Sequence, residues 1–195
     1  MSVFQLALTF FIVTNPIGNL PTILALLKNY SFSEQRKIMI REGFFSFLIA
    51  IFFQYFGEMF LGLLHIQDYA MSLCGGILLF ILAIEMIFPK HNTASEGAIQ
   101  QEPFIVPIAT PLLSGAGVLS LIMLFSKQEA NDIKISTAIV LAWIGVIVVM
   151  ALAPYLQKLL GKKGLLALEQ LMGMLLAIIA SGVLVKGVQL FIEAL

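Results

Sequence analysis

The sequence predicts an all-α integral membrane protein, and three observations lead to this fold class. Apolar residues make up 60% of the 195 residues and charged residues only 11%, against roughly 25% charged residues in a soluble domain. Mean hydropathy is +1.02. The apolar residues also gather into six stretches near the ~20 residues that a helix needs to cross a hydrocarbon core of ~30 Å. Alternating segments of about ten residues, typical of a membrane β-barrel, do not occur.

The same composition excludes several classes of protein. A soluble domain of this size leaves a large share of its residues exposed and could not hide so much apolar surface. Lys plus Arg balance Asp plus Glu at 11 each, so no basic surface for nucleic acid is predicted. A single cysteine, Cys74, excludes a disulfide framework. The expected environment is therefore the lipid bilayer.

Six membrane-spanning helices are predicted from the apolar stretches. They cover residues 3–27, 44–64, 70–88, 104–125, 135–156 and 171–192. The first stretch is preceded by no Lys or Arg and followed by no small-residue cleavage site, so we expect a membrane span there rather than a signal peptide. Ser31 and Glu34 have the spacing of a capping box, so the second helix is expected to begin near Ser31, as an amphipathic extension.

The basic residues are unevenly divided between the two sets of loops. Eight of them fall on one side: Lys28, Arg36, Lys37, Arg41, Lys90, Lys158, Lys162 and Lys163. The other side receives only Lys127 and Lys134, while Lys186 lies inside the sixth stretch. Because an excess of positive charge marks the cytoplasmic face, both termini are predicted to lie outside the cytoplasm.

An inverted repeat is predicted within a single membrane domain spanning 1–195. Superposing Pro16 on Pro111 aligns Asn15 with Thr110, at an offset of nearly half the chain. The copies then span about 1–90 and 103–195 and hold three helices each, so the second copy enters the membrane from the opposite side. Such repeats are typical of secondary transporters, whose site lies at the midplane. The alternative is that two unrelated helices both contain proline, which is common in membrane helices.

Each of the two prolines is expected to break its span. Proline has no backbone N–H and clashes with the carbonyl of the preceding turn, and the residue before it is pushed towards an extended conformation. Glycine nearby permits further unwinding, and a polar residue can cap the second half-helix. The candidate substrate-binding residues are Asn15, Pro16, Gly18, Asn19, Thr110, Pro111, Ser114 and Gly115.

The ends of the half-helices suggest a class of ligand. N–H groups at Asn19 and Ser114 suit a carboxylate, and carbonyls near Thr14 and Thr110 suit an ammonium group because a helix C-terminus is partly negative. One small zwitterion could contact both, so an amino acid is a natural ligand. The alternative is two continuous, merely kinked helices without a ligand.

Ionisable residues inside the spans have several interpretations. Glu58 is a candidate coupling residue that could relay a proton, or it sits at the outer interface, because membrane carboxylates either face the interior or reach water. Glu85 is expected to be an interfacial charge, and Lys186 to snorkel to the surface. Enzyme signatures are missing, since neither His65 nor His91 belongs to a zinc motif and no phosphate-binding loop occurs. No enzymatic activity, cofactor or metal site is therefore predicted.

Several segments resemble the MarC family of bacterial inner-membrane proteins, particularly its YhgN-like branch. They are residues 15–21, 74–86 and 102–112, with 167–173 in addition. The resemblance covers essentially the whole chain. It implies a bacterial inner-membrane location, six membrane helices, and a place beside the lysine-exporter-type superfamily, whose members export amino acids. The family commonly has Asp where this chain has Asn15, which can cap and hydrogen-bond but cannot carry a proton.

Two hypotheses about function follow. The first is a secondary transporter or exporter of a small solute, such as a neutral amino acid, across the cytoplasmic membrane. The second is a non-transporting membrane scaffold or assembly protein. A solute-sized cavity bounded by Asn15, Asn19, Thr110 and Ser114 would favour transport, whereas a tight, dry bundle would favour the scaffold.

Overall fold

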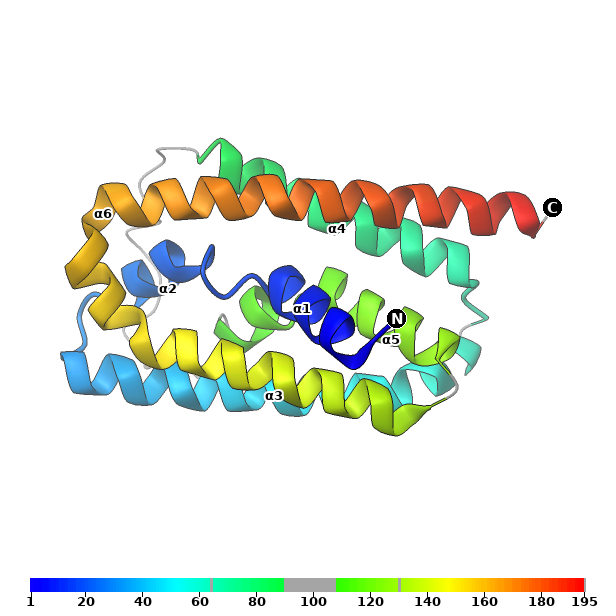
Figure 1. Cartoon of the computed structure of the whole chain (residues 1–195), viewed down its shortest axis with the longest axis horizontal. Helices are drawn as coiled ribbons and strands as arrows, with labels where there is room; N and C mark the ends of the chain where they lie inside the picture. The colour runs from blue at the N-terminus through cyan, green and yellow to red at the C-terminus, as the bar shows by residue number, and fades with distance from the viewer. Residues whose placement is uncertain (64, 90–107, 130, 195) are drawn as a thin grey trace.

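Every secondary-structure element in the part of the chain that the structure describes is a helix. The computed structural model describes residues 1–63, 65–89, 108–129 and 131–194. In chain order the elements are α1 (Val3–Thr14), α2 (Leu20–Leu26), α3 (Phe32–Leu63), α4 (Asp68–Ile87), the π-helical turn η1 (Ile108–Leu113), α5 (Ala116–Gln128) and α6 (Asp132–Glu193) (Figure 1). The all-helical class predicted from the sequence is therefore confirmed.

Three helices are long and apolar enough to cross a membrane, namely α3, α4 and α6. Helix α6 has 62 residues but is interrupted at Gly161, where φ is 62° and ψ is −177°. At this bend the chain turns back on itself (Figure 1), giving a first arm (132–160) and a second arm (162–193). Helices α1 and α5 are apolar but shorter, because each adjoins a break. Six spans and the inverted repeat stay predictions.

The start of α3 confirms the expected capping box. The backbone N–H of Ser31 donates to Glu34 Oε2 at 2.8 Å, and the N–H of Glu34 donates to Ser31 Oγ at 3.4 Å. These bonds satisfy N–H groups that have no partner within the helix. Helix α3 therefore begins at Phe32, well before its apolar stretch.

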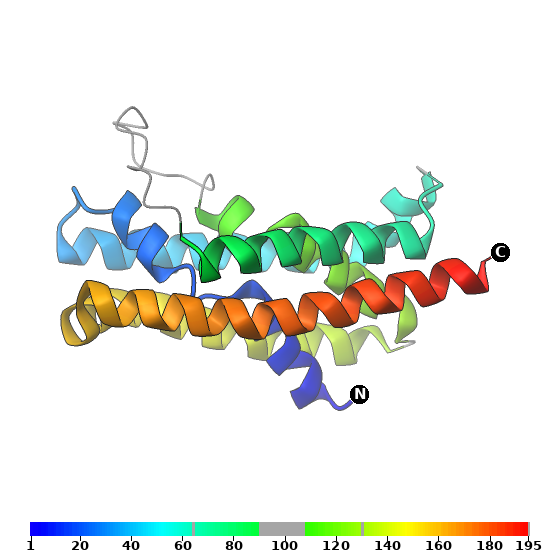
Figure 2. The same cartoon turned by 90° about the horizontal axis from the view of Figure 1, so that it is seen from above.

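Long helices surround the two broken segments. Helix α4 runs beside the second arm of α6 (Figures 1 and 2). Helix α3 pairs with the first arm in an antiparallel register, in which Gln54 bonds to Ser136 and Gly43 faces Ile147. Helices α1, α2 and α5 lie between these pairs, where Phe10 and Leu20 are fully buried. The broken segments are thus held in the interior.

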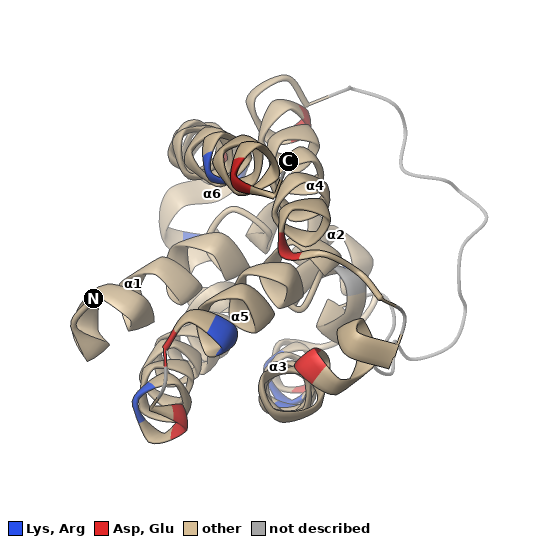
Figure 3. Ribbon diagram, turned by 90° about the vertical axis from the view of Figure 1, so that its right-hand side faces the viewer, with Lys and Arg blue, Asp and Glu red and all other residues tan. Residues whose placement is uncertain are grey.

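Charge and apolar surface are separated along the molecule. Large apolar side chains such as Phe52, Ile144 and Ile178 are exposed on the long helices, as expected of a surface that faces lipid. Seen from the end that carries the C-terminus, Lys or Arg and Asp or Glu positions are visible at the near ends of the helices, including α5 and α6 (Figure 3). The start of α3 and the bend in α6 lie together at the opposite end (Figure 1), so Arg36 and Lys162 share that end. The orientation relative to the cytoplasm stays a prediction.

Candidate functional site

The first break lies between α1 and α2 and is organised by Asn15. This residue ends α1 in the left-handed conformation, with φ 51° and ψ 50°, and not in the extended conformation that the following proline predicts. Asparagine is one of the few residues that tolerate this region. Its Oδ1 also accepts a hydrogen bond from the Gly18 N–H at 3.2 Å, which closes the turn locally. The expectation of an extended Asn15 is therefore wrong.

The second break lies between η1 and α5. Thr110 is extended, with φ −130° and ψ 129°, as its position before Pro111 predicts. The Ser114 N–H donates to the Ala109 carbonyl at 2.8 Å, a wider loop than that of an α-helix. Gly115 is also extended, with φ −73° and ψ 164°, and α5 begins at the next residue.

Of the two predicted helix caps, Asn19 occupies the N-cap position of α2 without a side-chain capping bond, and Ser114 lies one residue before Gly115, the N-cap of α5. Both side chains are instead buried, with at most 4% exposure. Their polar atoms bond to other segments of the chain, because in a dry interior those groups also need partners.

The two breaks are in direct contact. Asn19 Nδ2 donates to the Leu112 carbonyl at 2.9 Å and to the Thr14 carbonyl at 3.3 Å. One amide thereby joins the start of α2, the end of α1 and the backbone of η1. The side chain of Pro111 lies outside the described residues, whereas Pro16 is buried. Residues of the two predicted half-sites thus share one buried region.

A closed hydrogen-bonded network extends this region to α3 and α6. Ser46 Oγ and Ser114 Oγ are 2.7 Å apart, and Ser114 Oγ donates to the Ser46 carbonyl at 3.0 Å. Trp143 Nε1 donates to Ser46 Oγ at 3.0 Å. Since a hydroxyl has one proton to give, Ser46 donates to Ser114 and accepts from Trp143. Ser46 lies near the middle of α3, so the network is near the centre of the bundle.

Two buried polar atoms near this network have no hydrogen-bond partner among the described residues. They are Thr14 Oγ1 and Glu42 Oε2. The Glu42 side chain is fully buried, and its other oxygen, Oε1, accepts from Arg41 Nε at 3.0 Å. We call Thr14, Asn15, Asn19, Glu42, Ser46, Ser114 and Trp143 the polar core. Glu42 was not among the predicted site residues, but the spacing of Glu42, Ser46, Ala50 and Gln54 by one helical turn is a signal that could have found it.

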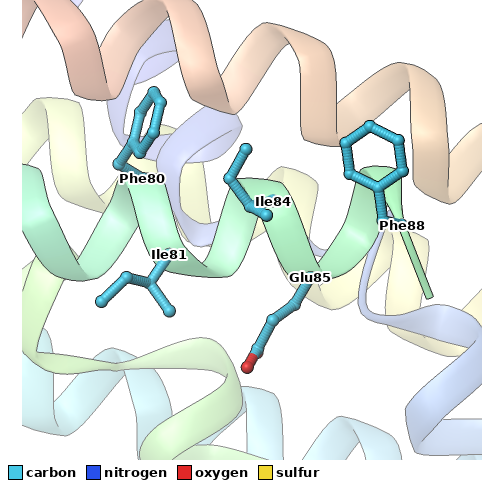
Figure 4. Close-up of a pocket in the computed structure, with 5 residues that line it drawn as sticks. All are labelled: Phe80, Ile81, Ile84, Glu85 and Phe88. Atoms are coloured by element: carbon cyan, nitrogen blue, oxygen red, sulfur yellow. The ribbon is translucent and has the colours of Figure 1, made fainter. Parts of the chain in front are cut away.

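The other candidate residues lie away from the polar core. Glu58 is exposed near the end of α3. Glu85 is also exposed and points into a pocket of about 450 Å³ beside α4, lined by Phe80, Ile81, Ile84 and Phe88 (Figure 4). Lys186 donates to Gln128 Oε1 and lies 5.5 Å from the centre of the Phe125 ring. Among the described residues no group of three or more His, Cys, Asp or Glu could hold a metal ion.

Comparison with known families finds one that matches nearly the whole chain. A family model described as MarC family integral membrane protein matches residues 1–192. The chain belongs to the MarC family. MarC family relatives include the UPF0056 inner membrane protein YhgN of Escherichia coli strain K12, which is 36% identical over 189 residues covering 96% of both chains. A UPF0056 membrane protein of Chlamydia trachomatis serovar D is 36% identical over 188 residues, covering 95% of this chain and 92% of the relative.

A UPF0056 membrane protein of Buchnera aphidicola subsp. Schizaphis graminum is 33% identical over 179 residues, covering 91% of both chains. No solved structure matches this MarC family protein. Together with its apolar helices, the named inner-membrane relatives support a multi-pass inner-membrane location.

Proposed function

We propose that this MarC family protein is a secondary transporter of a small, polar, uncharged or zwitterionic solute such as a neutral amino acid. The observation that carries the proposal is the bond from Asn19 Nδ2 to the Leu112 carbonyl, which joins two helix breaks inside the bundle. Irregular backbone at membrane depth is tolerated where it is buried in protein or lines a cavity. In transporters, such paired breaks form the solute site.

The polar core is costly for a protein that only needs to be stable. A buried polar group without a hydrogen bond costs roughly 1–3 kcal/mol on mutational scales, and Thr14 Oγ1 lacks a partner among the described residues. Asn15 Nδ2 is 2.9 Å from Met86 Sδ, and a thioether sulfur is a weak acceptor. A solute oxygen would be a better acceptor for this donor. These groups support a binding role for the polar core.

The described conformation corresponds to a closed state in this proposal. The N–H of Gly18 donates to Asn15 Oδ1, that of Asn19 to the Asn15 carbonyl, and that of Leu20 to the Ile17 carbonyl. These donors are therefore not free for a carboxylate. Solute recognition would rest on side-chain amides and hydroxyls that exchange their present partners when the breaks separate.

The scaffold hypothesis is favoured by one observation. Asn15, Asn19 and Ser114 are at most 4% exposed, and none of them lines the pockets beside Glu85, Lys186 and Tyr30. A bundle that never opens would have the same packing. The two hypotheses differ in whether the purified protein moves solute.

A proteoliposome screen with labelled neutral amino acids tests the transport proposal. We expect at least one solute to accumulate or exchange, and Ser114→Ala to lower its uptake by up to about tenfold, which corresponds to roughly 1.4 kcal/mol. Ser72→Ala is the matched control, because this buried serine of α4 bonds to the Val183 carbonyl, away from both breaks. If no solute moves across the screen, the scaffold hypothesis is preferred.

A glycine pair tests the geometry of the first break. A Cβ at Gly18 would lie 2.2 Å from Met86 Cε and 2.6 Å from the Asn15 amide, so Gly18→Val is expected to displace Asn15 and abolish uptake. A Cβ at Gly62 would meet nothing within 4 Å, so Gly62→Val is expected to retain uptake. Lys186→Gln is also expected to leave uptake nearly unchanged. If Lys186→Gln abolished uptake while Gly18→Val retained it, the result would indicate a solute site near the C-terminal end of α6 and not at the first break.

A further inference from the structure

We propose that Glu42 is a proton-binding site of the polar core, and that its protonation accompanies the opening of the two breaks. Glu42 is fully buried, and its Oε2 has no hydrogen-bond partner among the described residues. A carboxylate inside a membrane protein is costly unless both of its oxygens have partners, and Arg41 satisfies Oε1 alone. An unpartnered oxygen is therefore the atom at which a proton would bind, leaving Oε1 in contact with Arg41.

Apolar residues oppose Glu42 across the helix interface. The antiparallel register of α3 and the first arm, fixed by Gly43 against Ile147 and by Ser46 against Trp143, places residues 147–150 of α6 beside Glu42. These residues are Ile147, Val148, Val149 and Met150. Among the described residues, therefore, no charged side chain of α6 is paired with Glu42.

The remaining charged groups near Glu42 are few. Arg41 on the same helix holds Oε1 at 3.0 Å. Neither α1, α2 nor η1 contains an ionisable side chain. Tyr155 and Lys158 of α6 pack against Phe32, which is about 15 Å along α3 from Glu42 at the helical rise per residue. Lys90, His91, Glu96 and Glu102 lie outside the described residues.

A proton suits this place better than a metal ion. A bound Na⁺ or Ca²⁺ needs several oxygen ligands arranged around it, whereas a proton needs only the carboxylate oxygen. Taking up a proton would remove the negative charge and turn Oε2 into a donor. Arg41 is 32% exposed while Glu42 is fully buried, so the carboxylate lies one residue away from a side chain that reaches the surface.

Glu42 is placed to influence the breaks through Ser46. The two residues are one turn apart on the buried face of α3, and Ser46 contacts both Ser114 at the second break and Trp143 of α6. A change of charge at Glu42 would alter the balance of interactions that hold α3 against η1 and α6. The coupling to solute rests on the proposed transport function, but proton binding does not.

Infrared spectroscopy of the full-length protein in liposomes tests proton binding directly. We expect a carboxyl C=O band that appears as the pH is lowered, that is lost in Glu42→Gln and that shifts in Glu42→Asp. The band is expected to persist in Glu85→Gln, because Glu85 is exposed. A band that survives in Glu42→Gln, or that is lost in Glu58→Gln instead, overturns the proposal. If Glu42→Gln does not fold, the shift in Glu42→Asp still decides the assignment.

The coupling is tested with whichever solute the uptake screen identifies. A pH gradient is expected to drive at least tenfold accumulation in the native protein, whereas Glu42→Gln should exchange labelled solute without gradient-driven accumulation. Accumulation that depends on Na⁺, or that is unaffected by Glu42→Gln, overturns the coupling. A titrating Glu42 band in a protein that moves no solute would reject the transport function and leave the proton-binding site standing.

Discussion

At the scale of single residues, several side chains of the polar core have partners that lie far away in the sequence. Asn19 bonds to a carbonyl of η1 and Ser46 bonds to Ser114, so each break is held by the other half of the chain. Asn15 has a different role, because its left-handed backbone and its own side chain form the turn. The core therefore combines residues with local partners, Asn15 and Glu42, with several that depend on tertiary contacts.

Asn19 gives a prediction about stability. Asn19→Leu preserves the approximate shape of the side chain but leaves the Leu112 and Thr14 carbonyls without the amide donor. The free energy of unfolding is expected to fall by about 2–4 kcal/mol, from roughly 1–3 kcal/mol for each buried unsatisfied group. Thermal unfolding in detergent measures it. Thr137→Val is the control, because its exposed hydroxyl bonds to the Ile133 carbonyl within its own helix. A loss as large in that variant would contradict the assignment.

At the scale of helices, glycines allow α4 to pack closely on two neighbours. A Cβ at Gly76 would lie 2.8 Å from Leu184 of α6, and one at Gly75 would lie 2.7 Å from Ser120 of α5. Small residues drive membrane helices together because they let the backbones approach. Gly173 of α6 also packs closely on α4, because a Cβ there would lie 2.9 Å from Met86 Cβ. Ser181, further along α6, does not belong to this packing face, because it is exposed and bonds within its own helix.

Two glycines of the second arm of α6 form a matched test of this packing. A Cβ at Gly187 would lie 2.8 Å from Leu73 Cγ and 3.0 Å from the Leu73 backbone N, whereas one at Gly182 would meet nothing within 4 Å. Gly187→Ala is expected to lower the free energy of unfolding by about 1–3 kcal/mol through overpacking. Gly182→Ala is expected to be neutral or slightly stabilising, because alanine favours the helix. Equal unfolding midpoints for the two variants would contradict the close approach of α4 and α6.

At the scale of the whole molecule, local chemistry predicts where the chain bends but not which groups meet. The proline rules predict the extended Thr110, and the capping-box spacing predicts the start of α3; both agree with the structure. The bonds from Ser114 to Ser46 and the burial of Glu42 depend on how α3 packs against η1. A capping preference is worth only ~1 kcal/mol, so an interior hydrogen bond of similar strength can replace it.

The distribution of basic residues leads to a prediction of sidedness. Residues at the start of α3 and at the bend of α6, including Arg36 and Lys162, share one end of the molecule, and Gln67 at the start of α4 lies at the other end (Figure 1). The positive end is expected in the cytoplasm. Single cysteines at Gln67 and at Arg36 test this once the exposed Cys74 has been replaced by alanine. A membrane-impermeant thiol reagent added to whole cells should label Gln67→Cys and spare Arg36→Cys, and both should be labelled after the cells are lysed.

Both positions are exposed, so a failure to label would reflect sidedness and not burial. The reverse pattern would place both termini in the cytoplasm. The end of the molecule that holds the start of α3, with Arg41 and Glu42, would then face the outside. The proton proposed to bind at Glu42 would then come from the opposite compartment.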